Sequence, residues 1–404
     1  MKTQASLAIL MTLAVTAAGC GVGPSATTAT VKASDVQALA KSGEIIVKFR
    51  SGQSRQAITG LTQRLGLRTV GAIAKLDMQV VKGGTAETLA ALKASPEVLF
   101  AEVNATESLP PVRKETGVIK SGDPMMDQQW SLSKINAAGA WAVTKGDAKT
   151  VVAVVDTGVD YNHPDLAGRV IKGYDFANKD EDPMDGQGHG THCAGIVAAG
   201  LDNGVGVAGV APGVSILAVK VLSDAGSGST DDVCAGIVYA ADHGASVISL
   251  SLGGSGGQQA KQAAVDYALS KGAVVVAAMG NNGKEMQVYP GGSKGVIGVG
   301  ATTAEDTRAT FSNFGDWISV GAPGHKILSS VPGGGYQAFS GTSMATPAVA
   351  GLAALIRSQY PTLSAKEVQA RIEGSAVDLG TPGFDKEFGH GRIDAAAAVK
   401  AARR

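Results

Sequence analysis

The chain has 404 residues and a balanced charge, with 35 basic and 35 acidic side chains. This balance argues against a nucleic-acid or anionic-surface partner, because both favour a net positive charge. The length predicts a large buried core beside a smaller folded unit, and the 44% of apolar and 17% of charged residues are typical of a globular protein. The 55 glycines have no fixed period, which excludes a collagen-like chain and is typical of a fold with many tight turns.

The first twenty residues have the pattern of an export signal. Lys2 precedes an apolar run from Leu7 to Val15, and small residues end in the letters AAGC at Cys20. The run is too short for a permanent membrane span, and no later apolar stretch of about eighteen residues follows. We therefore expect a signal peptide over residues 1–20 and a secreted, extracellular protein. The ending also resembles a bacterial lipoprotein signal, so we favour a lipid anchor at Cys20 of the precursor over ordinary cleavage.

Residues 21–42 are small and polar and are interpreted as a flexible spacer. Residues 43–103 predict a small α+β domain, a sheet with two helices on one face, which at about sixty residues is marginally stable alone. Its expected elements are EIIVKF, a helix near 55–65, LDMQVV, a helix near 86–94, and EVLFAEV. Residues 104–122, with Pro110 and Pro111, lack apolar periodicity and predict an exposed, cleavable linker.

Residues 123–404 alternate apolar strand patterns with helical patterns. The expected strands are TVVAVVD, SILAVKVL, ASVISLSL, AVVVAAMG and VIGVGA, and the expected helices between them are GTHCAGIVAAG, TDDVCAGIVYAADHG and QQAKQAAVDYALSKG. Strands that are apolar throughout are buried on both faces, which predicts an α/β fold with a doubly wound, mostly parallel sheet. Such a sheet places its site at the carboxyl ends of the strands, where Asp156 and Asn281 fall.

Two cysteines, Cys193 and Cys234, remain after export, and both lie in apolar helical patterns. Sequence alone does not give the distance between them, so a disulfide stays open. Because a core of this size does not need a disulfide, we expect both thiols to be free and buried.

Three segments contain the parts of an activated serine. Asp156 ends VVAVVDTGVD, His189 opens GHGTHCAGI, and Ser343 lies in SGTSMATPAVAG. An imidazole can take the proton of a serine hydroxyl, while a carboxylate fixes the tautomer of the imidazole and stabilises its protonated form. A carboxylate at the end of an apolar strand also needs such a partner. The three residues are therefore predicted to lie together.

The order Asp, His, Ser differs from that of chymotrypsin-type and hydrolase-fold chains and is the order of the subtilisins. The three motifs and the PEVLFAEVN run at residues 96–104 resemble subtilisin-like serine proteases with an inhibitory prosegment. The resemblance extends from about Glu44 to the end and implies a subtilisin-like catalytic domain over 123–404. It implies an endopeptidase that hydrolyses proteins or peptides through an acyl-enzyme, and whose prodomain, residues 43–103, is an intramolecular inhibitor removed by self-processing. We expect a monomer.

Within this resemblance, Asp156 is the orienting acid, His189 the general base and then general acid, and Ser343 the nucleophile. Asn281, in AAMGNNG, matches the asparagine that donates to the oxyanion, together with the Ser343 backbone N–H. The substrate is expected to add as a strand, and Val288 to narrow the pocket for the residue before the cut. The other residues that match the substrate strands are Ser251, Leu252, Gly253, Gly254, Gly226, Ser227 and Gly228.

The segment LDNGVGVAG resembles a calcium loop of the same family. The implied ligands are hard oxygen donors of the kind Ca²⁺ requires, namely Asp123, Asp165, Leu201, Asn203, Val205 and Val207. A second cluster, Asp175, Asp180 and Asp182, is similar to another calcium loop, but Asn178 and Met184 depart from its pattern. The second site therefore stays open.

Other chemistries fit these residues less well. An aspartic protease needs a second DTG or DSG segment, which the chain lacks. His192 and Cys193 have metal-like spacing, but a zinc peptidase would also need a glutamate such as the one in HExxH, so His192 is interpreted as structural. A binding protein on a catalytically dead protease fold would lack a triad or oxyanion residue, and none is missing. An esterase or a peptide ligase could use the same residues. Only a comparison of peptide turnover with ester turnover would distinguish such an enzyme from a protease.

Overall fold

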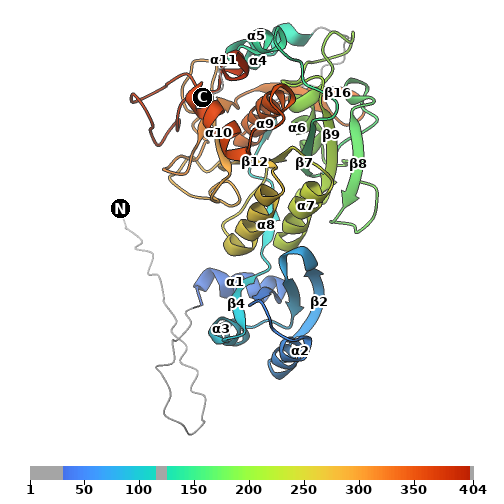
Figure 1. The fold of residues 1–404 in the computed structure, drawn as a ribbon, viewed down its shortest axis with the longest axis vertical. Coiled ribbons are helices and arrows are strands. Elements are labelled where there is room, and N and C mark those ends of the chain that lie inside the picture. Colours follow the sequence, from blue (N-terminus) through green and yellow to red (C-terminus); the bar gives the residue numbers. More distant parts are fainter. Residues whose placement is uncertain (1–30, 115–124, 401–404) are drawn as a thin grey trace, which may run out of the picture. The chain divides into compact units, whose positions relative to one another are not determined.

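The computed structural model describes residues 31–114 and 125–400. The chain divides into two compact units, residues 1–106 and 107–404 (Figure 1). The predicted export signal with Cys20 and the predicted calcium ligand Asp123 lie outside the described residues. Within the described ranges, no helix is long and apolar enough to cross a membrane.

The first unit is a four-stranded antiparallel sheet in the order β2-β3-β1-β4, with helices beside it (Figure 1). Ile45 and Val47 of its central strand share a buried core with Leu89 and Leu92. This is the expected small α+β domain. Its elements are α1 (Ala33–Ser42), β1 (Glu44–Phe49), α2 (Arg55–Arg64), β2 (Arg68–Ile73), η1 (Ala74–Leu76), β3 (Met78–Lys82), α3 (Ala86–Ala94) and β4 (Val98–Val103).

The spacer predicted over 21–42 is wrong for its described end, because residues 33–42 form helix α1. Leu39 of this helix is buried in the core of the unit, and Gly43 ends the helix in the left-handed conformation while its N–H bonds the Leu39 carbonyl. Strand β2 was also not predicted. It is an edge strand in which only Ile73 is buried, so it shows no apolar alternation.

The second unit is built on seven parallel strands in the order β14-β13-β12-β11-β7-β9-β8. The expected doubly wound sheet is confirmed, and the five predicted strands are its centre. The edge strands β8 and β14 were missed, since β8 is half exposed and β14 has four residues. The strands are β7 (Val151–Asp156), β8 (Val170–Asp175), β9 (Ser215–Lys220), β11 (Val247–Leu250), β12 (Val274–Ala278), β13 (Ile297–Thr302) and β14 (Val320–Pro323).

Helices cover both faces of this sheet. The buried helices α6 and α9 pack together on one face, and α7 and α8 pack together on the other (Figure 1). The direction of strand order reverses between β7 and β11, the position at which sheets of this kind bind ligands. The helices of the unit are η2 (Met125–Gln128), α4 (Trp130–Lys134), α5 (Ala137–Trp141), η3 (Pro164–Leu166), α6 (His189–Ala198), α7 (Thr230–Asp242), α8 (Gln258–Ser270), α9 (Thr342–Gln359), α10 (Ala365–Gly374) and α11 (Ala395–Lys400).

The linker predicted to be exposed over 104–122 is partly buried in its described portion. Asn104 is 3% exposed and Glu107 is fully buried. The segment also forms two short strands, because its backbone pairs with other strands. Strand β5 (Thr106–Ser108) pairs with β10 (Ser227–Ser229), and β6 (Arg113–Lys114) joins β15 (Ile327–Val331) and β16 (Gly335–Ser340) in a small sheet.

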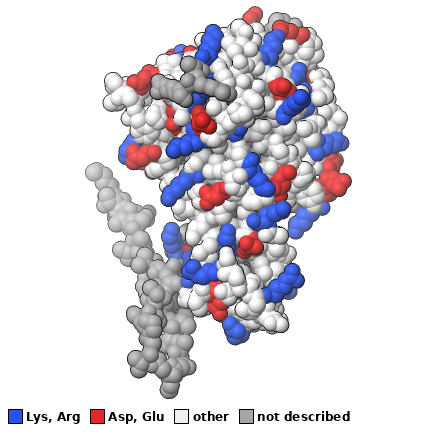
Figure 2. All heavy atoms as spheres, in the orientation of Figure 1, with Lys and Arg blue, Asp and Glu red and all other residues white. Residues whose placement is uncertain are grey.

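Basic and acidic side chains are interspersed over the face seen in Figure 2, as expected from the balanced composition. Cys193 and Cys234 are both buried and are not joined in a disulfide, as predicted for them.

Candidate active site

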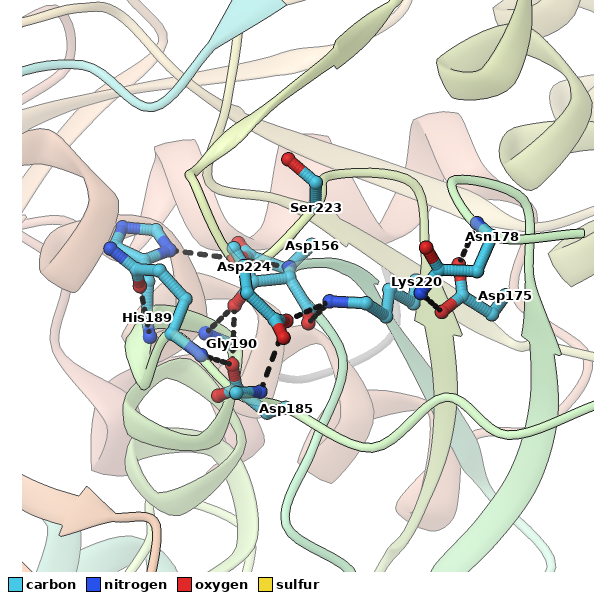
Figure 3. Close-up of polar contacts among 12 residues, drawn as sticks. Asp156, Asp175, Asn178, Asp185, His189, Gly190, Lys220, Ser223 and Asp224 are labelled. Atoms are coloured by element: carbon cyan, nitrogen blue, oxygen red, sulfur yellow. Dashed lines mark hydrogen bonds and ion pairs between the residues drawn. The ribbon is translucent and has the colours of Figure 1, made fainter.

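Asp156 and His189 form a buried pair at the carboxyl end of the central strand β7. Asp156 Oδ1 lies 2.7 Å from His189 Nδ1 and also accepts the Thr157 N–H at 2.8 Å (Figure 3). Both side chains are at most 2% exposed. Burial by itself lowers the pKa of His189, but the charge and hydrogen bond of Asp156 outweigh it, so the pKa lies well above 6.5.

His189 is the first residue of α6, and its position depends on a close approach of two backbone segments. A side chain at Gly190 would overlap the carbonyl oxygen of Gly158, just after β7. Gly188 precedes the helix with a φ of 104°, which a residue with a side chain rarely adopts. The glycines on both sides of His189 therefore allow the helix to start against the end of β7.

Asp185 is a positioning residue that the sequence analysis missed. Its buried carboxylate accepts five hydrogen bonds of 2.6 to 2.9 Å: from the Gln187, Gly188 and Thr191 N–H groups and from the Thr157 and Thr191 hydroxyls. These bonds tie the turn after Asp156 to the turn before His189 (Figure 3). The only sequence signal is an Asp four residues before His189 in DGQGHGT, which is also a common turn pattern.

Lys220 was also missed. It lies beside Asp156 in the pairing of β9 with β7 and is 1% exposed. Its Nζ donates to the Thr157 carbonyl at 2.6 Å and to Asp224 at 2.7 Å (Figure 3). The lysine therefore fixes the backbone that follows Asp156.

Ser343 lies in the first turn of α9, whose N-cap is Gly341. The Ser343 side chain is buried, and its Oγ donates to the Ser251 carbonyl at 3.0 Å. The His189 Nε2 is buried and has no hydrogen-bond partner among the described residues. The hydroxyl and the imidazole are thus not bonded to each other in this conformation, and a rotation of the hydroxyl is needed to join them.

Asn281 lies just after β12 and is oriented by Thr342, a third residue missed from sequence. Its Oδ1 accepts both the N–H and the hydroxyl of Thr342 at 2.8 Å. This leaves Nδ2 to donate to the Pro111 carbonyl at 3.0 Å. A side chain at Gly341 would contact both Asn281 Nδ2 and the Ser343 N–H, so these two donors flank the same small space.

The segment around Pro111 runs through this site as an extended chain. Ser108 pairs with Gly253 in antiparallel fashion, and the Leu109 N–H donates to the Gly226 carbonyl at 3.0 Å. The segment therefore lies between two of the glycine-rich stretches that sequence assigned to substrate. It occupies them as an added strand would.

Most predicted substrate residues border this strand. Leu252, Gly253, Gly254 and Val288 line a cavity of about 210 Å³ with Pro110 and Pro111, and Gly226 and Ser227 line a neighbouring one with Leu109 and His189. Gly228 lies in β10, the strand that pairs with β5 of this segment. Ser251 differs, because it is buried and its hydroxyl donates to the Ser343 carbonyl, so it does not face the added strand.

Some of the predicted calcium residues lie close together. Asp165 is 1% exposed and accepts Asn203 Nδ2 and the Val207 N–H, both at 2.8 Å. Asn203 Oδ1 accepts the Val205 N–H at 2.8 Å, and Leu201 lies two residues before Asn203. Burial raises the pKa of Asp165, although these bonds oppose the shift. In the second acidic cluster, Asp175 accepts two bonds from Asn178 (Figure 3).

His192 has a structural environment. Its Nε2 lies 2.9 Å from the Gln337 carbonyl, and its ring stacks on Phe339 at 4.1 Å. Burial lowers the pKa of His192 to about 3, so the ring is neutral. Cys193 Sγ lies 3.9 Å from His189 Nδ1, and burial raises the pKa of its thiol. Asp156, His189 and Cys193 thus form one cluster that belongs to the site described above.

Comparison with known proteins shows the family of the chain. The subtilase family matches residues 147–391, and the fervidolysin N-terminal prodomain matches residues 26–104. The chain is 40% identical over 407 residues to a thermophilic serine proteinase of Bacillus sp. strain AK1, covering 99% of this chain and 98% of that protein. It is 48% identical over 273 residues to thermitase of Thermoactinomyces vulgaris, covering 68% and 96%.

A solved structure is also similar to this chain. Fervidolysin from Fervidobacterium pennivorans, described as a keratinolytic enzyme related to subtilisin, matches with a TM-score of 0.77 and 31% identity. The match covers 89% of this chain and 61% of the fervidolysin chain. The chain therefore belongs to the subtilase family and is a subtilisin-like serine protease with a fervidolysin-like N-terminal prodomain.

Proposed function

We propose that Asp156, His189 and Ser343 are the catalytic triad of this protease and that Asn281 and the Ser343 N–H bind the oxyanion. The observation that most favours this assignment is the buried 2.7 Å contact of Asp156 with His189. At the same edge of the sheet, Asn281 donates a hydrogen bond to the Pro111 carbonyl. A preorganised donor aimed at a carbonyl is what transition-state stabilisation requires.

In this mechanism Ser343 Oγ leaves the Ser251 carbonyl and donates to His189 Nε2. His189 takes the proton as Oγ attacks the substrate carbonyl, while Asp156 stabilises the imidazolium. The proton then passes to the leaving amine, and water hydrolyses the acyl-enzyme by the same route. Asp185 and Thr342 act as positioning residues, because they hold His189 and Asn281 in the geometry described above.

We further propose that residues 107–112 inhibit the enzyme by occupying its cleft and that self-processing removes the prodomain within 104–122. The 3.0 Å contact of Asn281 with the Pro111 carbonyl favours a cut after Pro111. Export stays a prediction from the first twenty residues, and so does a lipid anchor at Cys20. Processing would detach such an anchor from the catalytic unit.

A structural Ca²⁺ at the Asp165 loop is the remaining part of the proposal. Asp165 is a buried carboxylate, and no lysine or arginine in the described ranges forms an ion pair with it. The carbonyls of Leu201, Val205 and Val207 are of the oxygen type that Ca²⁺ prefers. Asn203 Nδ2 faces Asp165 in this structure. To become a Ca²⁺ ligand, Asn203 would rotate its amide so that Oδ1 faces the cation beside Asp165.

Replacement of Ser343 by Ala should lower peptide turnover by several orders of magnitude and leave the precursor at full length. Asn281→Ala should lower kcat about 10² to 10³-fold, because one oxyanion donor is lost. Turnover of a quenched fluorescent peptide and the mass of the purified protein measure both effects. The exposed Ser270→Ala is the control and should process normally. Turnover by folded Ser343→Ala would reject the triad.

The rate should depend on the protonation of His189. Since its pKa is raised and only the neutral ring accepts a proton, kcat/KM should fall as pH drops, with a midpoint above 6.5. Asp156→Asn removes the charge that raises this pKa, so the midpoint should move to lower pH while kcat falls by about 10⁴. The exposed Asp316→Asn should leave the midpoint in place. An unmoved midpoint in Asp156→Asn would contradict the coupling.

Chelation should shorten the thermal half-life of the processed enzyme severalfold while the initial rate stays nearly constant. A cation that binds only the folded state stabilises it by mass action, and Asp165 is not in contact with the triad. In Asp165→Asn the half-life should no longer respond to added Ca²⁺. The exposed Asp202→Asn, in the same loop, should keep the response. A chelator-insensitive half-life in the unmodified enzyme would exclude the site.

A further inference from the structure

Lys261 is a buried cation close to the cleft. It is the fourth residue of α8 and is fully buried. Its Nζ donates to the Gly256 carbonyl at 3.0 Å and to the Tyr289 carbonyl at 3.2 Å. These neutral groups hold the ammonium in place without compensating its charge. A buried charge of this kind is costly unless an anion accompanies it.

The anion in this structure is Glu107. Its Oε1 lies 2.6 Å from Lys261 Nζ and accepts the Thr230 hydroxyl at 2.7 Å, and the carboxylate and the ammonium are both 0% exposed. The space exists because residue 254 is glycine, where a side chain would meet Glu107 Oε2. Lys261, Thr230 and Gly254, here called the carboxylate pocket, thus enclose one acidic side chain.

Glu107 reaches the carboxylate pocket from the strand that fills the cleft. The next residue, Ser108, pairs with Gly253, and Leu109 bonds Gly226. Four residues after Glu107, the Pro111 carbonyl accepts Asn281 Nδ2. Any substrate that adds to the same edges therefore presents a side chain to the same pocket. Once processing removes residue 107, Lys261 loses its only carboxylate partner among the described residues.

We propose that the carboxylate pocket makes this protease select an acidic residue, with Glu favoured, at the fourth or fifth position before the cut, and that Lys261 determines this specificity. The proposal rests on the proposed function above. A neutral side chain would leave the ammonium buried and unpaired, whereas a glutamate restores the pair with Lys261 and the bond from Thr230. Glu107 of the linker is then the first occupant of the pocket.

The test is a set of quenched fluorescent peptides assayed with processed enzyme. The peptides share one sequence and differ only in having Glu, Gln, Leu or Lys at a single position from the third to the sixth before the cut. Glu at the fourth or fifth position should raise kcat/KM about tenfold or more over Gln and Leu, with Lys the poorest. At the other positions the four residues should differ little.

Lys261→Met should remove the preference for Glu while cleaving the Leu peptide at least as fast as the unmodified enzyme. Thr230→Val, which keeps the shape and removes one donor, should reduce the preference severalfold and serves if Lys261→Met does not fold. The matched control is Lys271→Met, at the exposed end of the same helix, which should keep the full profile.

Equal rates for Glu and Gln at both positions, or a preference for Glu that persists in Lys261→Met, would overturn the proposal. If the enzyme still cleaves the Leu peptide and a serine-directed reagent blocks this cleavage, the proteolytic assignment holds and only the pocket assignment has failed. Cleavage of none of the peptides would instead count against the proposed function itself.

Discussion

The buried carboxylate of Asp156 is the constraint on which the rest of the site depends. It ends a strand whose other residues are apolar, so its charge must be met by hydrogen-bond donors and by the imidazole of His189. That requirement brings α6 against the end of β7, which only glycine at 190 permits. Asp185 and Lys220 then fix the turns on either side. The proposed catalytic geometry is thus a consequence of pairing one buried charge in a parallel sheet.

The same sheet edge explains how a chain segment can fill the cleft. Glycines at 226, 253 and 254 leave room for a strand, and residues 107–112 occupy that room with main-chain bonds that any peptide could make. Selectivity must therefore come from side-chain pockets. Val288 lines one of them beside the prolines, and Lys261 provides a fixed positive charge in another. Inhibition by the linker and recognition of substrate use the same contacts in this account.

Sequence patterns predicted the features that repeat or are uniformly buried. The five apolar strands and the helices between them were visible because burial on both faces leaves a continuous apolar run. The small α+β domain over 43–103 was visible from its alternating strand and helix patterns. Edge strands β2 and β8 were missed since their exposed faces have no such signal, and α1 was missed because only one residue, Leu39, is fully buried. Thr342 and Lys261 were invisible for another reason: their partners, Asn281 and Glu107, are distant in sequence. Asp185 was missed because most of its hydrogen bonds are local, so it looks like an ordinary turn residue.

The most direct measurement is the mass-spectrometric location of a serine-directed phosphonylating reagent on the processed enzyme. The account predicts one label per molecule, on Ser343, which accumulates at the same rate as peptide turnover is lost. Labelling should be much slower in His189→Ala whose prodomain has been removed with an added protease. Peptide hydrolysis that continues after Ser343 is fully labelled, or inactivation with the label on another serine, would contradict it.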